Sequence, residues 1–251
     1  MIEIGPEFFA FAVPAVLFAA VSKGGFGSGA AFAAAPFLAL ILPPAQAIGL
    51  MLPLLLVMDA TALRPFWGRW DWAISKRLIL GGLPGVALGA AIYRVANADA
   101  LRLMIGVVAV GFVIWQLARA RGWIRLERAS PGPVAGYVWG AVAGLTSFIS
   151  HAGGPPAAVY LLTQKLDKTT YQATTVISFA VVNLFKLVPY TALGIFSRET
   201  LIADLYLVPV AVLGVYAGVW LHRIVNERLF FGLTYAFLTV TGCKLILDAL
   251  T

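Results

Sequence analysis

Long apolar stretches alternate along the chain with short clusters of charged residues. No charged side chain occurs from Gly24 to Met58, a stretch too long for a single membrane-crossing helix, which needs ~20 residues. Proline pairs and glycines mark turns within and between the apolar stretches. The pattern predicts helical segments at about 8–22, 29–42, 45–66, 76–93, 101–118, 134–149, 155–164, 171–193, 201–222 and 229–250.

Two of these segments, 29–42 and 155–164, are too short to cross a bilayer. Each follows a glycine-rich break, so each reads as one arm of a helical hairpin that enters the membrane partway. Non-helical backbone at that depth is tolerated only where it lines a cavity within the protein. The two breaks are therefore the first candidates for a binding site.

The two halves of the chain resemble each other. Five residues of the first half, Gly85, Val86, Gly89, Arg94 and Asn97, recur 129 positions later as Gly214, Val215, Gly218, Arg223 and Asn226. At an offset of 124, Gly29 and Pro65 correspond to Gly153 and Pro189. The pattern predicts a first repeat at 1–118, a basic cytoplasmic linker at 119–133 and a second repeat at 134–251. Five segments per repeat invert the second repeat, so we expect an all-α polytopic membrane protein of two inverted repeats with about 8–10 transmembrane segments.

The composition agrees with this fold class. Apolar residues make up 61% of the 251 positions and charged residues 12%, whereas soluble domains average ~45–50% and ~25%. These values exclude a soluble enzyme, a nucleic-acid-binding module, a disordered protein and a secreted disulfide scaffold. Cys243 is the single cysteine, so no internal disulfide can form.

The net charge of +7 is attributed to cationic cytoplasmic loops. One side of the predicted topology holds thirteen basic residues, if Lys23 is included, and the other side holds Arg94, Arg102, Arg198 and Lys244. This bias assigns the larger set to the cytoplasm. We therefore expect a multi-pass protein of a bacterial-type inner (plasma) membrane, with both termini outside the cytoplasm.

The two glycine-rich breaks carry the residues best suited to bind an anion. These are Ser22, Lys23, Gly24, Gly25, Gly27, Ser28 and Gly29 in the first break, and Ser150, His151, Ala152, Gly153 and Gly154 in the second. Unpaired backbone N–H groups and the positive end of a helix dipole attract anions, and Lys23 and a protonated His151 add positive charge. Two alternatives stay open: glycines that serve only close helix packing, and a Lys23 that extends to the membrane surface.

Two charged residues lie inside predicted spans. Asp59 lies about two turns from the inner end of segment 45–66, and Lys186 lies at a similar depth from the outer end of 171–193. At the offset of 124, Asp59 corresponds to Asn183, one turn before Lys186. Because intramembrane charges usually face a cavity or a partner, Asp59 is the candidate for proton or cation coupling, and Asn183 and Lys186 for substrate contact. The alternatives are an Asp59–Arg64 pair and a Lys186 that extends to the membrane surface.

The glycine-rich stretch from Lys23 to Gly29 leading to Pro36, its counterpart from His151 to Pro156, the duplication and the chain length resemble the sulfite exporter TauE/SafE family. This family is also named for toluene sulfonate uptake permeases. The resemblance covers essentially the whole chain and implies secondary transport of sulfur-containing anions such as sulfite, aromatic sulfonates or sulfoacetate. It also implies that the substrate binds between the tips of the two hairpins. The second break departs from an all-glycine pattern, because Pro155 and Pro156 lack N–H groups and leave fewer donors there.

The leading hypothesis is a secondary active transporter of an organosulfonate or sulfite that works by alternating access. A negative-inside potential opposes entry of a monoanion by ~2.3 kcal/mol per 100 mV, so uptake needs a coupled proton or sodium ion, whereas export does not. The alternatives are a passive anion channel and a membrane enzyme that acts on a small anion or lipid. No Walker A sequence, zinc-ligand spacing or nucleophile elbow occurs, so no cofactor, metal, catalytic residue or nucleic-acid partner is expected.

Overall fold

A computed structural model describes residues 5–25, 31–124, 132–221 and 227–251, with the backbone alone for 227–231. The elements are α1 (Pro6–Gly25), η1 (Ala31–Ala33), α2 (Ala34–Leu38), α3 (Pro44–Phe66), α4 (Trp72–Val95), α5 (Ala98–Ala120), α6 (Pro133–Ser150), α7 (Gly154–Leu161), η2 (Leu162–Gln164), α8 (Lys168–Ala192), α9 (Arg198–Leu221) and α10 (Glu227–Leu250). The described residues form no strand.

Eight of the described helices are long and apolar enough to cross a membrane: α1, α3, α4, α5, α6, α8, α9 and α10. The predicted all-α fold class is confirmed, and eight spans fall within the predicted number. The short helices α2 and α7 lie in the two segments that the sequence marks as too short to cross a bilayer.

Several helices begin earlier than the apolar pattern predicts, because capping residues precede them. The Asp71 carboxylate accepts from Ile74 N, so α4 begins at Trp72 and not at position 76. In the same way the Asn97 side chain caps α5 and the Asp167 carboxylate caps α8. The apolar pattern leaves these polar first turns out of the predicted helices, although their backbone hydrogen bonds make them part of the helices in the structure.

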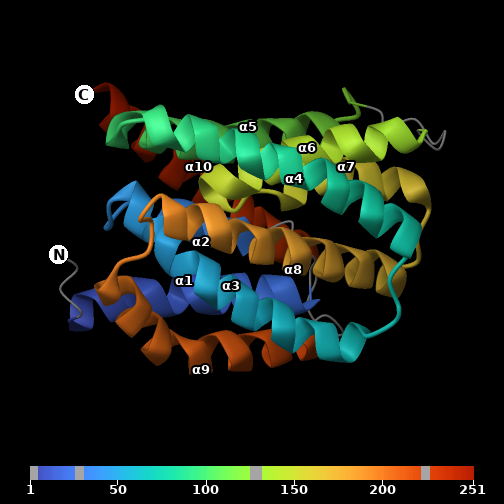
Figure 1. Cartoon of the computed structure of the whole chain (residues 1–251), viewed down its shortest axis with the longest axis horizontal. Coiled ribbons are helices and arrows are strands. Elements are labelled where there is room, and N and C mark those ends of the chain that lie inside the picture. Colours follow the sequence, from blue (N-terminus) through green and yellow to red (C-terminus); the bar gives the residue numbers. More distant parts are fainter. Residues whose placement is uncertain (1–4, 26–30, 125–131, 222–226) are drawn as a thin grey trace.

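The helices pack mainly across the two halves of the chain. Helix α1 packs on α9, α4 packs on α6, and α5 packs on α10. Helices α3 and α8 contact each other, and α3 also contacts α9 while α8 also contacts α4. Figure 1 shows α1, α3 and α9 in one layer, with α4, α5 and α6 in another and α8 between them. The centre of the bundle is therefore built by α3 and α8, one helix from each half.

The beginning of α1 and the end of α10 lie at the same end of the bundle, on the left in Figure 1. We call this the terminal end and the opposite end the basic end. The described cations at the basic end lie on the last turns of α3 and α5, on the first turns of α4 and α8 and on the adjoining loops: Arg64, Arg69, Lys76, Arg77, Arg119, Arg121, Lys165 and Lys168.

Glycines permit the closest helix contacts, most of all between α4 and α6. A Cβ atom at Gly85 would overlap the carbonyl oxygen of Ala141, and one at Gly144 would overlap the carbonyl oxygen of Gly82. Without hydrophobic driving force between helices in lipid, such close backbone contact supplies much of the association energy. The α4–α6 pair is thus specified by small residues on both helices.

The Gly85→Ala variant is expected to lower the stability of the folded protein by ~1–3 kcal/mol, because its Cβ atom would force α4 away from α6. Gly111→Ala is the matched control, since nothing lies within 4 Å of the Cβ position at Gly111. Thermal unfolding of both variants in detergent measures the difference. Equal melting temperatures for the two variants would show that the α4–α6 contact is not close enough to resist a methyl group.

Candidate functional site

Polar side chains from α1, α3, α6 and α8 meet inside a bundle whose core is otherwise mostly apolar. Six residues, each at most 8% exposed, form what we call the buried polar cluster: Lys23, Asp59, Ser147, His151, Asn183 and Lys186. A buried charged group is unfavourable unless it is paired or binds a ligand. The contacts within the cluster therefore decide what it can do.

One part of the cluster joins α1, α3 and α8. Lys23 Nζ lies 2.7 Å from Asp59 Oδ1, and Asn183 Nδ2 donates to Asp59 Oδ2 at 2.7 Å. The ion pair is short but poorly angled, so Asp59 Oδ1 has no hydrogen-bond partner among the described residues. Lys23 Nζ donates weakly to Leu55 O at 3.4 Å instead. Moving two charges out of water is costly, and their mutual attraction offsets this cost only in part.

The other part of the cluster surrounds Lys186 of α8. Its ammonium donates to Ser147 O and Ser147 Oγ, each at 3.0 Å, and lies 2.9 Å from His151 Nδ1. Three acceptors match the three N–H groups of a charged lysine. The ring of Tyr190 also lies 5.9 Å from Lys186 Nζ, in cation–π range.

The contacts of His151 assign its protonation. His151 Nε2 lies 2.9 Å from Ile48 O, which can only accept, so Nε2 carries the proton. Nδ1 is then the acceptor for Lys186, and the imidazole is neutral. In this arrangement His151 does not supply the positive charge that the sequence suggested for it, and instead orients Lys186.

A tight turn after α6 positions His151. His151 has φ +57°, a left-handed conformation that histidine adopts more readily than most residues. The turn is closed by His151 N donating to Ser147 O and by the Thr146 hydroxyl donating to Ala152 O. Asn183 and Lys186 are three residues apart on α8, which places both side chains on the face toward the cluster.

With both lysines protonated, the cluster has one more positive charge than negative charge: Lys23 and Lys186 are two ammonium groups, Asp59 is one carboxylate, and His151 is neutral. A buried ammonium without a carboxylate is unfavourable, so a bound anion would favour the protonated form of Lys186. Lys186 is 0% exposed, and no acidic side chain among the described residues lies in ion-pair distance of it. A buried site with a net positive charge is suited to a monovalent anion.

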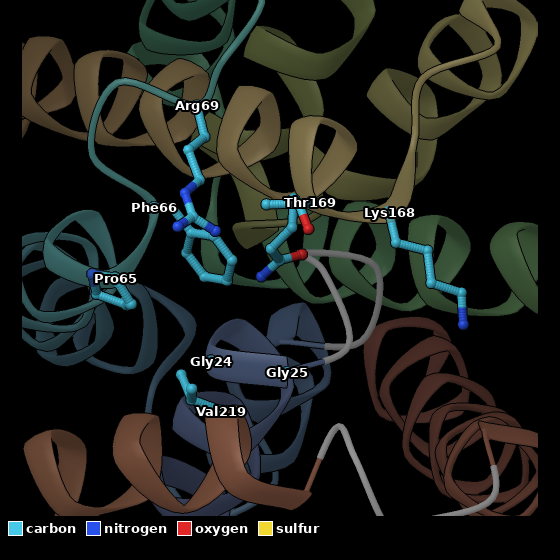
Figure 2. A pocket seen from close by; sticks show the side chains of 9 residues that line it. Gly24, Gly25, Pro65, Phe66, Arg69, Lys168, Thr169 and Val219 are labelled. Atoms are coloured by element: carbon cyan, nitrogen blue, oxygen red, sulfur yellow. The ribbon is translucent and has the colours of Figure 1, made fainter.

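A cavity of about 260 Å³ opens next to the cluster at the basic end (Figure 2). We call it the vestibule, and its lining residues are Gly24, Gly25, Pro65, Phe66, Arg69, Lys168, Thr169, Gln172 and Val219. Figure 2 shows Arg69 reaching toward the ring of Phe66, while Lys168 extends from the start of α8. Gln172 connects the vestibule to the cluster, since its Nε2 donates to Lys23 O at 2.9 Å.

The structure brings some of the predicted site residues together and separates others. Lys23, Asp59, His151, Asn183 and Lys186 belong to one cluster, whereas Ser150 donates to Thr146 O within α6. Asp59 therefore does not pair with Arg64, and neither Lys23 nor Lys186 extends to the membrane surface, so those alternatives are wrong. The predicted residues Gly27, Ser28 and Gly29 lie outside the described residues.

The predicted glycines next to the cluster are also packing positions. A Cβ atom at Gly24 would overlap Val215 O of α9, and one at Gly153 would lie 2.5 Å from the Phe179 ring. Ser22 and Gly25 are buried in the last turn of α1, and Ala152 and Gly154 are buried beyond the His151 turn. The packing interpretation of the glycines therefore holds at Gly24 and Gly153, and the N–H donors of the cluster belong to side chains.

Sequence reasoning missed Gln172 and the cations of the vestibule. A signal for Gln172 existed, because it lies 124 positions after Ile48, the offset that relates Asp59 to Asn183. Ile48 and Gln172 each form a hydrogen bond with the glycine-rich break of the other half of the chain. Ile48 O contacts His151 Nε2, and Gln172 Nε2 donates to Lys23 O. Nothing in the sequence distinguished Arg69 and Lys168 from the other basic residues of the loops.

Comparison with known proteins identifies one family. The family model described as sulfite exporter TauE/SafE matches residues 12–245, nearly the whole chain and all six residues of the buried polar cluster. No curated protein and no solved structure gave a significant match.

Proposed function

The chain belongs to the sulfite exporter TauE/SafE family of membrane transporters, and from this premise we propose that it is a secondary active transporter of a sulfur-containing anion. Its eight membrane-length helices agree with a multi-pass membrane protein. The observation that carries the proposal is Lys186, an ammonium that is 0% exposed and has no acidic partner among the described residues. A bound anion would compensate this charge.

The donors around that charge support the proposed substrate class. Sulfonates and hydrogen sulfite are tetrahedral or pyramidal oxyanions with a single negative charge, which matches the one positive charge of the cluster. An anion that replaced Ser147 or His151 at Lys186, or Asp59 at Lys23 and Asn183, would receive charge-assisted and neutral N–H donors from these side chains. Arg69 and Lys168 at the vestibule raise the local concentration of anions at its mouth. An organosulfonate, such as an aromatic sulfonate or sulfoacetate, or sulfite is the proposed substrate.

Alternating access is supported by the pairing of the helices. In chain order, α1, α3, α4 and α5 of the first half correspond to α6, α8, α9 and α10 of the second half. Under this correspondence the α1–α9 contact matches the α6–α4 contact, and the α3–α9 contact matches the α8–α4 contact. The α3–α8 and α5–α10 contacts each join two corresponding helices. The Asn183–Asp59 hydrogen bond joins residues that correspond at the offset of 124. We propose that the halves are inverted repeats, that the segments after α1 and α6 are hairpins, and that the substrate binds between the hairpin tips.

Coupling is proposed at Asp59. A substrate anion that binds Lys23 competes with Asp59 for the same ammonium. The displaced carboxylate would then be unpaired in the protein interior and would take up a cation, either a proton or sodium. One anion and one cation would move together, which removes the electrical penalty of uptake.

The proposed orientation places the basic end in the cytoplasm and both termini outside. Lys23 no longer counts toward the charge bias, because it is buried and paired with Asp59. Twelve of the thirteen basic residues remain, against four on the other side. The positive-inside rule still favours the same orientation.

The proposal is tested with purified protein in liposomes and a panel of labelled anions: sulfite, sulfoacetate, an aromatic sulfonate, sulfate and chloride. We expect saturable uptake of at least one sulfite or sulfonate, accelerated by an inward proton or sodium gradient, and exchange against the same anion inside. Flux without saturation or exchange would indicate a channel. If no sulfonate and no sulfite moves or stabilises the protein against heating, the proposed function is wrong.

A further inference from the structure

A second buried carboxyl lies outside the buried polar cluster. Asp204, on the second turn of α9, is 4% exposed, and neither of its oxygens has a hydrogen-bond partner among the described residues. It lies on the inward-facing stripe of α9 with Ala203, Leu207 and Ala211, each 0% exposed. Coupling at Asp59 makes no use of it.

Helix packing places Asp204 near the terminal end of the bundle. The rings of Phe9 and Tyr206 lie 6.0 Å apart, and Gly218 packs on the backbone of Val21, so α1 and α9 run parallel. In this register Asp204 is level with the first two turns of α1. Asp204 comes six residues after Arg198 at the start of α9, about 9 Å along the helix axis.

The charged groups on the helices packed against α9 do not compensate Asp204. On α1, Glu7 is exposed, and Lys23 is paired with Asp59 of α3 near the other end of the helix. On α3, the remaining charge is Arg64, which is exposed at the basic end. Neither helix therefore brings a cation to Asp204 within the described residues.

The titratable groups of α9 itself do not compensate Asp204 either. Arg198 and Tyr206 are exposed, and Glu199 carries the same charge as an ionised Asp204. The field of the helix dipole is confined to the first turn, which ends before Asp204. An ionised Asp204 would thus be an isolated buried charge.

We propose that Asp204 is a proton-binding site, which holds its proton while α9 is packed on α1 and α3 and releases it when the terminal end opens to water. An unpaired carboxylate is far less favourable in an apolar interior than the neutral acid. A metal cation is held by several ligands, and Asp204 belongs to no group of three or more His, Cys, Asp or Glu side chains among the described residues. The proton is therefore the ligand that fits.

The site is mechanically connected to the substrate site, because α9 also packs on the last turn of α1. Gly24, next to Lys23, lies against Val215, and Val219 lines the vestibule. A movement of α9 that exposes Asp204 would shift these contacts as well. This coupling to anion transport rests on the proposed function, whereas proton binding by Asp204 does not.

Infrared spectroscopy of the protein in lipid bilayers tests the proton site without any anion. Near neutral pH, where an aspartate in water is ionised, we expect the carbonyl stretch of a protonated carboxyl in the unmodified protein and its loss in Asp204→Asn. Asp99→Asn is the control, because Asp99 is 59% exposed and paired with Arg102, and it should leave the band unchanged. Asp204→Glu should retain an acid band. An unchanged band in Asp204→Asn would overturn the proposal.

Anion exchange with the same pH on both sides of the membrane tests the link to transport. One titrating proton allows the rate to change by at most about tenfold per pH unit. The comparison is made in the Asp59→Asn background, so that Asp59 contributes no titration, and adding Asp204→Asn, which mimics the neutral acid, should make the rate independent of pH. A pH response of the same size before and after Asp204→Asn is added to Asp59→Asn would overturn the link. If no tested anion moves but the infrared band is lost in Asp204→Asn, the transport function fails and the proton site stands.

Discussion

A Lys186→Met variant is expected to lose anion binding and transport while the protein remains folded. Methionine keeps the length of the side chain and removes the ammonium, which is the one buried charge of the cluster with no acidic partner among the described residues. A hydrogen bond to a charged group contributes ~1.5–3 kcal/mol, so removing it should weaken anion binding about 10- to 150-fold. The loss of net positive charge adds to this effect.

Two opposing effects on stability keep the Lys186→Met protein folded. Ser147 and His151 lose the donor that they now share, which is unfavourable. The buried charge that lacks a carboxylate is also removed, which is favourable. Melting temperature and anion-induced stabilisation should therefore be measured on the same samples.

Lys244→Met is the matched control for Lys186→Met. Lys244 is 55% exposed and pairs with Asp248 on the surface of α10, so its replacement should change neither anion binding nor stability measurably. If Lys186→Met bound and exchanged sulfite or sulfonate as the unmodified protein does, the anion would not bind at the buried polar cluster. A loss of binding in both variants would indicate a nonspecific effect of net charge.

The sequence predicted the helices better than their contacts. The alternation of apolar and charged stretches predicted the eight membrane-length helices to within four residues at each end, because membrane helices must satisfy their own backbone hydrogen bonds. It predicted a longer segment, 29–42, where α2 covers Ala34–Leu38. The offset of 124 even paired Asp59 with Asn183, which are hydrogen-bonded in the structure. The offset is informative here because the residues that it relates, Asp59 of α3 and Asn183 of α8, contact each other in the bundle.

The partners of the charged residues could not be predicted from hydropathy. Arg64 was a reasonable partner for Asp59 because it is near in sequence, but the two helices α1 and α3 bring Lys23 to Asp59 instead. Which face of a helix meets which neighbour depends on the packing of the helices, such as the close approach of Gly24 to the backbone of Val215. The same limit hid Asp204, which in sequence is one of several polar residues near the start of α9.

The second large effect is expected at the Lys23–Asp59 pair. Replacing either residue alone, as Lys23→Met or Asp59→Asn, leaves a buried charge without its partner and should cost ~3–5 kcal/mol of stability. The Lys23→Met/Asp59→Asn double variant removes both charges and should recover most of that loss. Thermal unfolding of the four proteins forms a double-mutant cycle, and additive effects of the two substitutions would contradict a direct ion pair.

Transport by the same variants separates binding from coupling. Asp59→Asn keeps Lys23 and Lys186 available to the anion, so it should still exchange anions across the membrane but should no longer accumulate them in response to a cation gradient. The double variant has recovered its stability but lacks the Lys23 ammonium, so it should exchange poorly. Accumulation by Asp59→Asn that still follows the gradient would remove Asp59 from the coupling mechanism. Normal exchange by the stable double variant would remove Lys23 from the binding site and leave Lys186 as the cluster's anion-binding charge.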